Sequence, residues 1–269
     1  MPKKLALSLF VLIVLMTTGL RAQSLGLSVF FMIMDLANNK SVPIEVVTPV
    51  LTKEEARLEK QRIFAEIKQL NKAIVKHPDS MPLRYTRGLL RSRIGVVEDA
   101  RADFLWCQAK NYLPDSCRFR LALFHLYTSP RVAQDMFDEL LQKNANHPQL
   151  YYYRGLNHLY WGTRNGRSLK NESELAIPEF DNAVRLNAHY WEALFMRGFA
   201  KQKAGDYAGA AQDYSKVMAL KPELDYLLLF RGAAHQDGGN SERACQDFEA
   251  AARKSIEGAD KFLKKYCGR

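Results

Sequence analysis

Arginine and an acidic residue recur at a fixed spacing in this chain of 269 residues. Three pairs are sixteen residues apart and a fourth is twenty-five apart: Arg87 with Asp103, Arg197 with Asp213, Arg231 with Asp247, and Arg154 with Glu179. A guanidinium group and a carboxylate can form a two-pronged, charge-assisted hydrogen-bonded pair. We therefore predict that each pair faces across two neighbouring helices, partly buried, and fixes their register. The alternative is a row of arginines for phosphate or RNA, which an acid available to each arginine disfavours.

The remaining reactive side chains give no sign of catalysis. The six histidines are scattered, and none belongs to a His-x-x-x-His motif or to a metal motif that contains glutamate. No glycine-rich phosphate loop follows a strand, and the sequence contains no Gly-x-Ser-x-Gly. The sequence therefore predicts a protein that is not an enzyme and that has no cofactor and no metal site.

The N-terminal 22 residues have the features of an export signal. Lys3 and Lys4 precede an apolar run, residues 5–16, and Leu20-Arg21-Ala22 ends in a small residue before Gln23. We expect cleavage after residue 22 and a protein that is secreted or lies in the periplasm. A second apolar stretch, residues 25–34, lies in the segment 23–51, which we expect to be a linker. The alternative is a chain that keeps its N-terminal apolar stretches as a membrane anchor.

The chain is basic, with a net charge of +10 and an isoelectric point near 9.4. This balance raises nucleic acid or an anionic membrane as partners, although net charge bears on non-specific association and not on fold. Lys3, Lys4 and Arg21 all fall in the expected signal. We predict no specific nucleic-acid partner and allow association with the envelope membrane.

An internal repeat becomes visible when the Arg-Gly pairs are aligned. Gly198 and Gly232 are 34 residues apart, and an alanine falls twelve residues after the glycine, with an aromatic residue four further on. The copies are Gly88 with Ala100 and Phe104, Gly198 with Ala210 and Tyr214, and Gly232 with Ala244 and Phe248. After Gly155 the alanine and the aromatic are delayed by nine residues, an insertion that also accounts for the longer spacing of Arg154 and Glu179. A weaker copy has Leu121 at the glycine position, and there Arg120 faces Met136, with Asp135 beside it.

Each repeat reads as two helices. Apolar residues recur at three- and four-residue spacing on either side of turns that hold Gly95, Ser129-Pro130 or Gly205-Asp206. The best copy, "WEALFMRGFAKQKAGDYAGAAQDYSKVMALKP", resembles the tetratricopeptide repeat (TPR) at Gly198, Gly205, Tyr207, Ala210, Tyr214, Leu220 and Pro222. The resemblance implies an all-α fold, a right-handed superhelical stack of about five helical hairpins. No hairpin could bury its apolar face alone, so neighbouring hairpins must stack.

The alignment divides the chain as follows. Residues 1–22 are the signal, 23–51 the apolar segment and linker, and 52–80 a leading helix. Residues 81–258 are the TPR array, with units 81–113, 114–147, 148–190, 191–224 and 225–258. The third unit carries an insertion, residues 162–175, which is polar and basic and which we expect to project as a loop. Residues 259–269 are a C-terminal capping helix.

The four cysteines permit three pairings, and their spacing is not that of a zinc site. In an oxidising compartment disulfides are expected, whereas in a reducing one all four would be thiols. The register of the repeat places Cys107 near Cys117 and Cys245 near Cys267. We therefore predict two disulfides, the second of which holds the capping helix.

The resemblance also implies a partner-binding groove lined by the first helix of each hairpin. The residues at the groove positions are Tyr85, Leu89 and Arg93; Tyr152, Leu156 and Tyr160; Phe195, Phe199 and Lys203; and then Leu229, Ala233 and Gln236. These side chains suit an extended or helical segment of another protein. The alternative is that the rings pack against one another or against residues 25–34. The sequence predicts an exported TPR scaffold for protein interaction; the alternatives are a membrane-anchored adaptor and an RNA-binding repeat protein.

Overall fold

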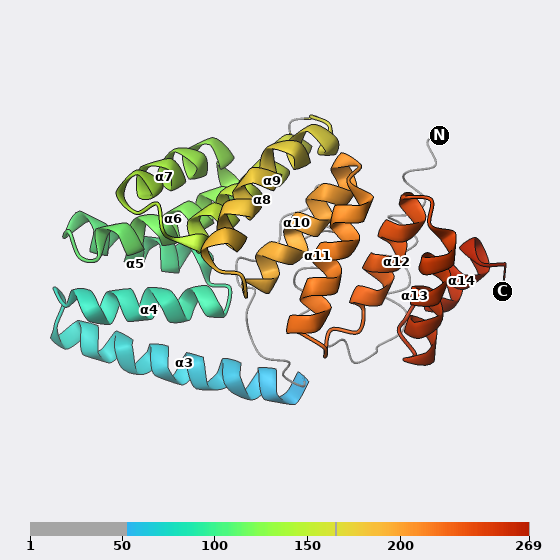
Figure 1. Ribbon diagram of the computed structural model, residues 1–269. Coiled ribbons are helices and arrows are strands. Elements are labelled where there is room, and N and C mark those ends of the chain that lie inside the picture. The colour runs from blue at the N-terminus through green and yellow to red at the C-terminus, as the bar shows by residue number, and fades with distance from the viewer. Residues whose placement is uncertain (1–52, 165, 269) are drawn as a thin grey trace. The chain divides into compact units, whose positions relative to one another are not determined.

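The structure is a computed structural model, and it describes residues 53–164 and 166–268. The predicted export signal and the segment 23–51 lie outside the described residues. The described residues are helical throughout, with short turns and no strand, and they form helical hairpins (Figure 1). This confirms the predicted all-α class and the arrangement in hairpins. The residues divide into two compact units, 53–145 and 146–268, which we call the N-terminal and the C-terminal unit.

The N-terminal unit contains a leading helix and two hairpins. Its helices are α3 (Lys53–Lys76), α4 (Met81–Arg93), α5 (Val97–Ala109), α6 (Pro114–Thr128) and α7 (Pro130–Lys143). Each helix packs against the next one along the chain. Helix α3 uses Ile63 and Ile67 for this contact, which cluster with Leu90 of α4. The leading helix therefore covers the apolar side of the first hairpin.

The C-terminal unit contains three hairpins and a short final helix. Its helices are α8 (Pro148–Arg164), α9 (Leu169–Leu186), α10 (Trp191–Ala204), α11 (Tyr207–Leu220), α12 (Leu227–Asp237), α13 (Ser241–Arg253) and α14 (Ala259–Tyr266). Successive helices again pack against each other. In α14, Phe262 and Tyr266 stack on Phe248 of α13, with ring centroids 5.0 and 6.1 Å away. The last helix thus covers the exposed side of the last hairpin, as a terminal cap does in a repeat array.

Local sequence explains where these helices begin. The side chain of Asp206 accepts a hydrogen bond from the backbone N–H of Gly209, and Asn240 accepts one from Arg243. Such caps satisfy backbone donors that the first turn leaves unpaired. The turn before Asp206 contains Gly205, whose φ of 101° is unfavourable for other residues. Gly205 therefore ends α10 and Asp206 starts α11.

Small residues bring the two helices of a hairpin into close contact. Gly198 in α10 faces the ring of Tyr214 in α11, and a Cβ atom at Gly198 would lie 3.0 Å from Tyr214 Cε1. Tyr214 is fully buried. The α6/α7 hairpin departs from this pattern, because Leu121 replaces the glycine and packs with Ala100 and Phe104 of α5. The Leu121 side chain therefore lies between two successive hairpins and packs against the ring of Phe104.

The insertion does not form the projecting loop that we predicted for residues 162–175. Helix α8 has 17 residues and α9 has 18, so most of the additional residues extend the two helices. Helix α9 begins at Leu169, where the side chain of Ser168 caps it by accepting a hydrogen bond from Lys170 N. Glu172 and Ser173 are buried, 2% and 0% exposed. The polar residues of the insertion are therefore the first turns of a helix whose inner side is closed off from solvent.

Candidate functional site

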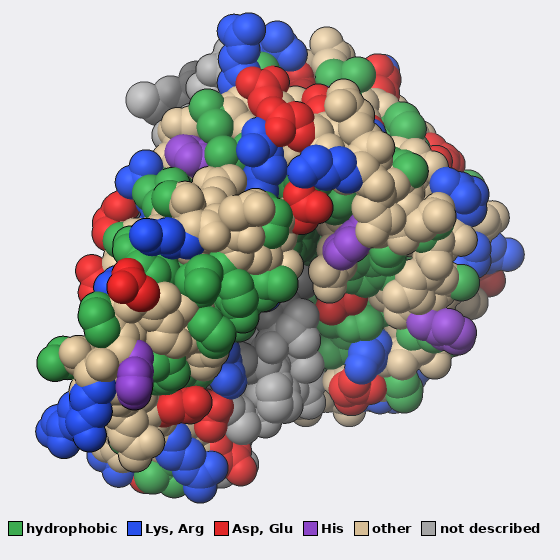
Figure 2. All heavy atoms as spheres, turned by 90° about the vertical axis from the view of Figure 1, so that its left-hand side faces the viewer, with side chains coloured by type: hydrophobic (Ala, Val, Ile, Leu, Met, Phe, Trp, Pro, Cys, Tyr) green, Lys and Arg blue, Asp and Glu red, His purple; other side chains and the backbone are tan. Residues whose placement is uncertain are grey.

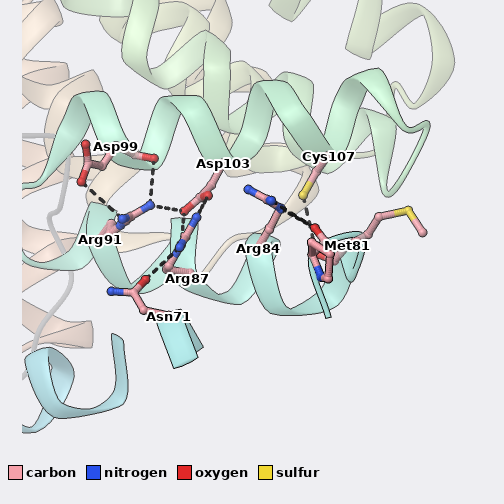
Figure 3. Close-up of polar contacts among 9 residues, drawn as sticks. Asn71, Met81, Arg84, Arg87, Arg91, Asp99, Asp103 and Cys107 are labelled. Carbon is pink, nitrogen blue, oxygen red and sulfur yellow. Dashed lines mark hydrogen bonds and ion pairs between the residues drawn. The ribbon is translucent and has the colours of Figure 1, made fainter. Parts of the chain in front are cut away.

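All four predicted arginine–acid pairs are present, and each joins the two helices of one hairpin. Arg87 in α4 donates from Nε and Nη2 to the two carboxylate oxygens of Asp103 in α5, at 3.0 and 2.6 Å (Figure 3). Arg197 binds Asp213 at 2.8 and 2.6 Å, and Arg231 binds Asp247 at 2.9 and 2.6 Å. Arg154 binds Glu179 at 2.8 Å. The Asp213 side chain is only 2% exposed, so the pair that it forms is a buried, two-pronged ion pair.

Each of the three two-pronged arginines also reaches back to the preceding helix, a contact that we did not predict. The acceptors lie sixteen residues before the arginine: Asn71 for Arg87, Asp181 for Arg197 and Ser215 for Arg231, at 2.8, 2.8 and 3.1 Å. One guanidinium therefore bridges its own hairpin and the helix before it. The same spacing, read backwards from each arginine, is the sequence signal that could have revealed these acceptors.

A second cation completes two of these clusters. Arg91, four residues after Arg87, donates to Asp103 at 2.7 Å and pairs with Asp99 at 3.3 Å (Figure 3). Lys201 occupies the same position in α10 and donates to Asp213 at 3.0 Å. Burial alone would lower the pKa of Arg197, but hydrogen bonds and charge from Asp213 and Asp181 raise it. These cations are all paired with acids inside the protein, so their role is structural. Paired in this way, they do not form an arrangement for binding phosphate.

Charges of both signs are mixed on the surface. On the face that Figure 2 shows, Lys and Arg side chains alternate with Asp and Glu side chains, without a continuous basic area. Ion pairs between exposed or half-buried side chains include Lys143 with Asp115, 2.7 Å, and Lys254 with Asp225, 2.6 Å. Basic and acidic side chains are thus intermixed on this face.

One of the two predicted disulfides is present. Cys245 in α13 and Cys267 after α14 are bonded. Cys107 and Cys117 are not bonded, so that prediction is wrong: both are buried thiols. Each sulfur has a backbone acceptor of its own, because Cys107 Sγ donates to Met81 O at 3.6 Å and Cys117 Sγ donates to Tyr112 O at 3.3 Å (Figure 3 shows the first). Burial raises the pKa of both thiols, to about 12 for Cys117, which keeps them protonated.

The predicted groove residues of the N-terminal unit remain reachable from solvent. Tyr85 and Leu89 in α4 are half-buried and border the cluster of Phe104 and Leu121. Arg93 is exposed and pairs with Glu59 of α3 at 2.9 Å. This face is therefore a mixed one, apolar next to α5 and charged next to α3.

The predicted groove residues of the C-terminal unit lie differently. Five of the six on α8 and α10 are buried, between 0 and 5% exposed: Tyr152, Leu156, Tyr160, Phe195 and Phe199. The Phe195 ring packs against Tyr214 and Phe230, with centroids 5.7 and 5.1 Å away. Phe195 is thus part of the core of this unit, whereas a partner role for Tyr152, Leu156, Tyr160 and Phe199 stays a prediction. Lys203, the sixth, is exposed.

The accessible inner surface of this unit lies on α10 and α12. The two helices are side by side, since Phe195 meets Phe230 and Gln202 Nε2 donates to Asp237 Oδ2 at 2.7 Å. We define the α10/α12 face as Glu192 and Lys203 of α10 with Tyr226, Leu229, Ala233 and Gln236 at α12. The four residues at α12 are all half-buried. Glu192 and Tyr226 were not predicted, although both lie at helical spacing one turn before the predicted positions.

This face carries polar atoms that lack partners. Among the described residues, the buried Tyr226 hydroxyl and the buried Gln236 Oε1 make no hydrogen bond. Leaving such an atom unpaired costs about 1–3 kcal/mol, and native structures contain few of them. Burial raises the pKa of Tyr226, to which Glu223 adds, so the hydroxyl stays a donor. The Tyr226 hydroxyl and Gln236 Oε1 are thus an unused donor and an unused acceptor that are closed off from solvent, and each meets a partner only when its side chain turns outwards.

The charged ends of α10 are also poorly compensated. Burial raises the pKa of Glu192, an effect that its own backbone N–H and Lys221 oppose. Although Lys203 is exposed as a residue, its ammonium group lies 5.3 Å from the centre of the Phe199 ring, and desolvation lowers its pKa despite nearby Asp237. Each charge would gain from a partner of opposite sign.

Within 53–164 and 166–268 no group of three or more His, Cys, Asp or Glu side chains is placed to hold a metal ion. The described helices include none with the length and apolar character needed to cross a membrane.

The fold is that of known TPR proteins. Similar solved structures include YrrB, described as a TPR protein with an unusual peptide-binding site, with a TM-score of 0.55 and 19% identity over 73% of this chain and 97% of YrrB. MamA from Desulfovibrio magneticus gives a TM-score of 0.55 and 16% identity over 67% of this chain and 98% of MamA. TTC0263, a thermophilic TPR protein in Thermus thermophilus, gives 0.51 and 15% over 70% and 98%. No protein-family model matches the sequence, and a comparison with curated protein sequences gives no match. At these identities the similarity establishes a TPR-like fold.

Proposed function

We propose that the chain is an exported, non-enzymatic scaffold that binds a segment of another protein on the α10/α12 face. The observation that carries the proposal is the pair of buried, unpartnered polar atoms, Tyr226 OH and Gln236 Oε1, beside half-buried Leu229 and Ala233. The buried acids of the same two hairpins, Asp213 and Asp247, are in contrast satisfied by their arginines. A segment that supplies one acceptor and one donor, met by outward turns of the Tyr226 and Gln236 side chains, removes the cost of both unpaired atoms.

The fold and the type of surface support this proposal. A half-buried apolar face with few polar groups is what an extended or helical segment of a partner recognises. The similar structure YrrB is described as having a peptide-binding site, which makes peptide binding compatible with this architecture. The α10/α12 face is also on the first helices of the hairpins, where the sequence predicted the groove.

Photo-crosslinking tests the proposal. p-Benzoylphenylalanine is placed at Leu229 and, as a control, at Leu105, an exposed α5 residue with 42% exposure. Each variant is expressed in the native host and irradiated, and the joined segment is mapped by mass spectrometry and then synthesised. We expect a single defined segment at position 229 only, and a synthetic peptide that binds about tenfold more weakly to a Gln236→Ala variant, equivalent to one lost hydrogen bond. Identical products at both positions, or equal binding to the variant, contradict the proposal.

Export is the second part of the proposal, and the Cys245–Cys267 bond supports it. Structural disulfides persist in oxidising compartments and are rare in the cytosol. N-terminal sequencing of the protein from its native host tests this. Gln23 as the first residue is expected; Met1 or Pro2 in the membrane fraction would favour the anchored alternative.

A further inference from the structure

Glu192 is an acidic residue in the first turn of helix α10, and it is unusual because it is buried. Acids in the first turn of a helix interact favourably with the helix dipole, and they normally do so from the surface. Seven such acids in the described helices are exposed: Glu54, Glu55, Glu98, Asp99, Asp115, Glu242 and Asp260. Two are buried, Glu172 in α9, 2% exposed, and Glu192 in α10, 9% exposed.

These two buried acids differ in their partners. Glu172 is paired with Arg167, whose Nη1 lies 3.4 Å from the carboxylate. In the part of the chain that the structure describes, the Glu192 side chain receives no ion pair and no hydrogen bond from another residue. Its closest cationic influence is Lys221, but the ammonium group of Lys221 pairs with Glu223 at 3.8 Å. An ionised carboxylate in this situation has lost water without gaining a cation.

Aromatic rings cluster where α10 begins, two residues from Glu192 in the sequence. Tyr190, two residues before Glu192, packs on Tyr152 with ring centroids 5.1 Å apart, and Tyr152 packs on Tyr153 at 5.1 Å. Burial raises the pKa of Tyr190, and Tyr153 and Glu192 add to this through their charges. Tyr153 and Tyr190 are half-buried and therefore accessible at their edges or faces. Tyrosine rings next to a carboxylate form a favourable site for a cation.

We propose that Glu192 receives a lysine or arginine side chain of the segment that binds the α10/α12 face. This proposal rests on the proposed function, because the segment must lie on that face to reach α10. A cation there restores the charge compensation that burial removed, while the tyrosine rings contact its apolar stem or its charged group. The partner segment therefore carries a basic residue next to apolar ones, and it approaches the beginning of α10.

Solution NMR with two matched small probes tests this. The probes are Nα-acetyl-arginine amide and Nα-acetyl-citrulline amide, which share shape and lack an N-terminal ammonium group but differ in charge. The full chain is labelled with ¹³C-glutamate, and the Glu192 carboxyl signal is assigned with the variant Glu192→Gln. We expect the arginine probe to shift this signal saturably, at least about tenfold more tightly than the citrulline probe, a ratio that corresponds to about 1.4 kcal/mol.

A matched variant and a separate readout make the result decisive. The variant Glu242→Gln removes an exposed first-turn acid of α13 and should leave the response of Glu192 unchanged. Equal shifts with both probes, or no shift with either, overturn the proposal, and neither outcome depends on whether a variant folds. If position 229 crosslinks to a defined segment while Glu192 ignores the arginine probe, the face binds a partner but Glu192 is not its cation receptor. If the probe binds and position 229 captures nothing specific, the proposed function fails instead.

Discussion

Two hairpins of this chain solve the same packing problem with different chemistry. In α10/α11, Gly198 lets the ring of Tyr214 approach, and Arg197 holds Asp213 by two hydrogen bonds while reaching back to Asp181. In α6/α7, Leu121 takes the place of the glycine and Met136 that of the acid. Arg120 there makes no ion pair among the described residues and lies 5.9 Å from the Phe119 ring centre.

The difference shows that a buried ion pair is one way to set the register of a helical hairpin, and not a requirement of the fold. The α6/α7 hairpin is fixed by shape, with Leu121 and Phe137 almost or fully buried. It also has a surface ion pair, Arg118 with Glu139. The stability of α10/α11, the polar hairpin, should therefore depend on the charges of its ion pair. The stability of α6/α7, the apolar hairpin, should depend on the volume of its buried side chains.

The largest effect is expected from Asp213→Ala. This substitution leaves Arg197 and Lys201 without their shared buried acid, which should lower the free energy of unfolding by about 4 kcal/mol. Urea unfolding followed by far-UV circular dichroism measures it. The control is Asp135→Ala in α7, an exposed acid beside Met136 without an ion pair in the described residues, which should change stability by less than about 0.5 kcal/mol. Equal losses would show that the charged pair does not set the difference between the hairpins.

Leu121→Ala tests the apolar hairpin. Leu121 is 1% exposed and packs with Ala100 and Phe104, so its truncation leaves a cavity that should cost roughly 3 kcal/mol. Val132→Ala, at a 40% exposed position of α7, is the control and should cost far less. The same urea experiment applies. If the two variants are alike, volume at position 121 is not what holds α6/α7 together.

The polar hairpins could be predicted from the sequence because their arginine and acidic residues recur at a fixed spacing. Arg197 and Asp213 could be paired by counting, and an insertion that shifts Glu179 by nine residues still keeps its partner. The glycine and the aromatic of each repeat gave the hairpins and their order in the same way. These features depend on a single repeat unit and are therefore local.

What the sequence did not reveal depends on neighbours that it does not specify. The insertion looked like a polar loop because Glu172 and Ser173 are polar, but their burial follows from Ser168 starting a helix against α8. Glu192 looked like an ordinary first-turn acid, and only its surroundings make it unusual. The register of the repeat predicted a Cys107–Cys117 disulfide, although each thiol can use a backbone carbonyl instead.

A smaller effect is expected where the polar hairpin is overfilled. Gly198→Val adds atoms where Tyr214 Cε1 and Ala210 O are already 3.0 and 3.3 Å from a Cβ position, and should cost roughly 2 kcal/mol. Ala208→Val, at an exposed position of α11, controls for the low helix propensity of valine, below about 0.7 kcal/mol. Thermal unfolding of both variants measures the contrast. Leu121 shows that a large residue is tolerated when the facing helix is arranged for it, so a neutral Gly198→Val would mean that α11 can move as well.

The smallest expected effect is on the pH dependence of stability. It concerns the position four residues after Arg197 and Arg231, where α10 has Lys201 and α12 has His235. Burial lowers the pKa of His235 below its usual 6.5, with Asp247 opposing the shift and Arg231 and Arg243 adding to it. The unfolded chain therefore takes up a proton that the folded chain refuses, so stability is complete above pH 6.5 and falls as the pH drops below it. The variant His235→Gln should reduce this loss of stability between about pH 7.5 and about pH 5.5, measured as the difference in Tm between the two pH values.

Part of the loss should remain in this variant, because burial and Arg101 lower the pKa of His125 in α6 as well, with the same sign. The double variant His125→Gln with His235→Gln should then be flatter than either single variant. His189→Gln, at an exposed position before α10, is the control and should keep the full slope. If His235→Gln keeps it too, the histidine next to Asp247 is compensated well enough to charge in the folded state, and α12 resembles α10 more closely than its residue type indicates.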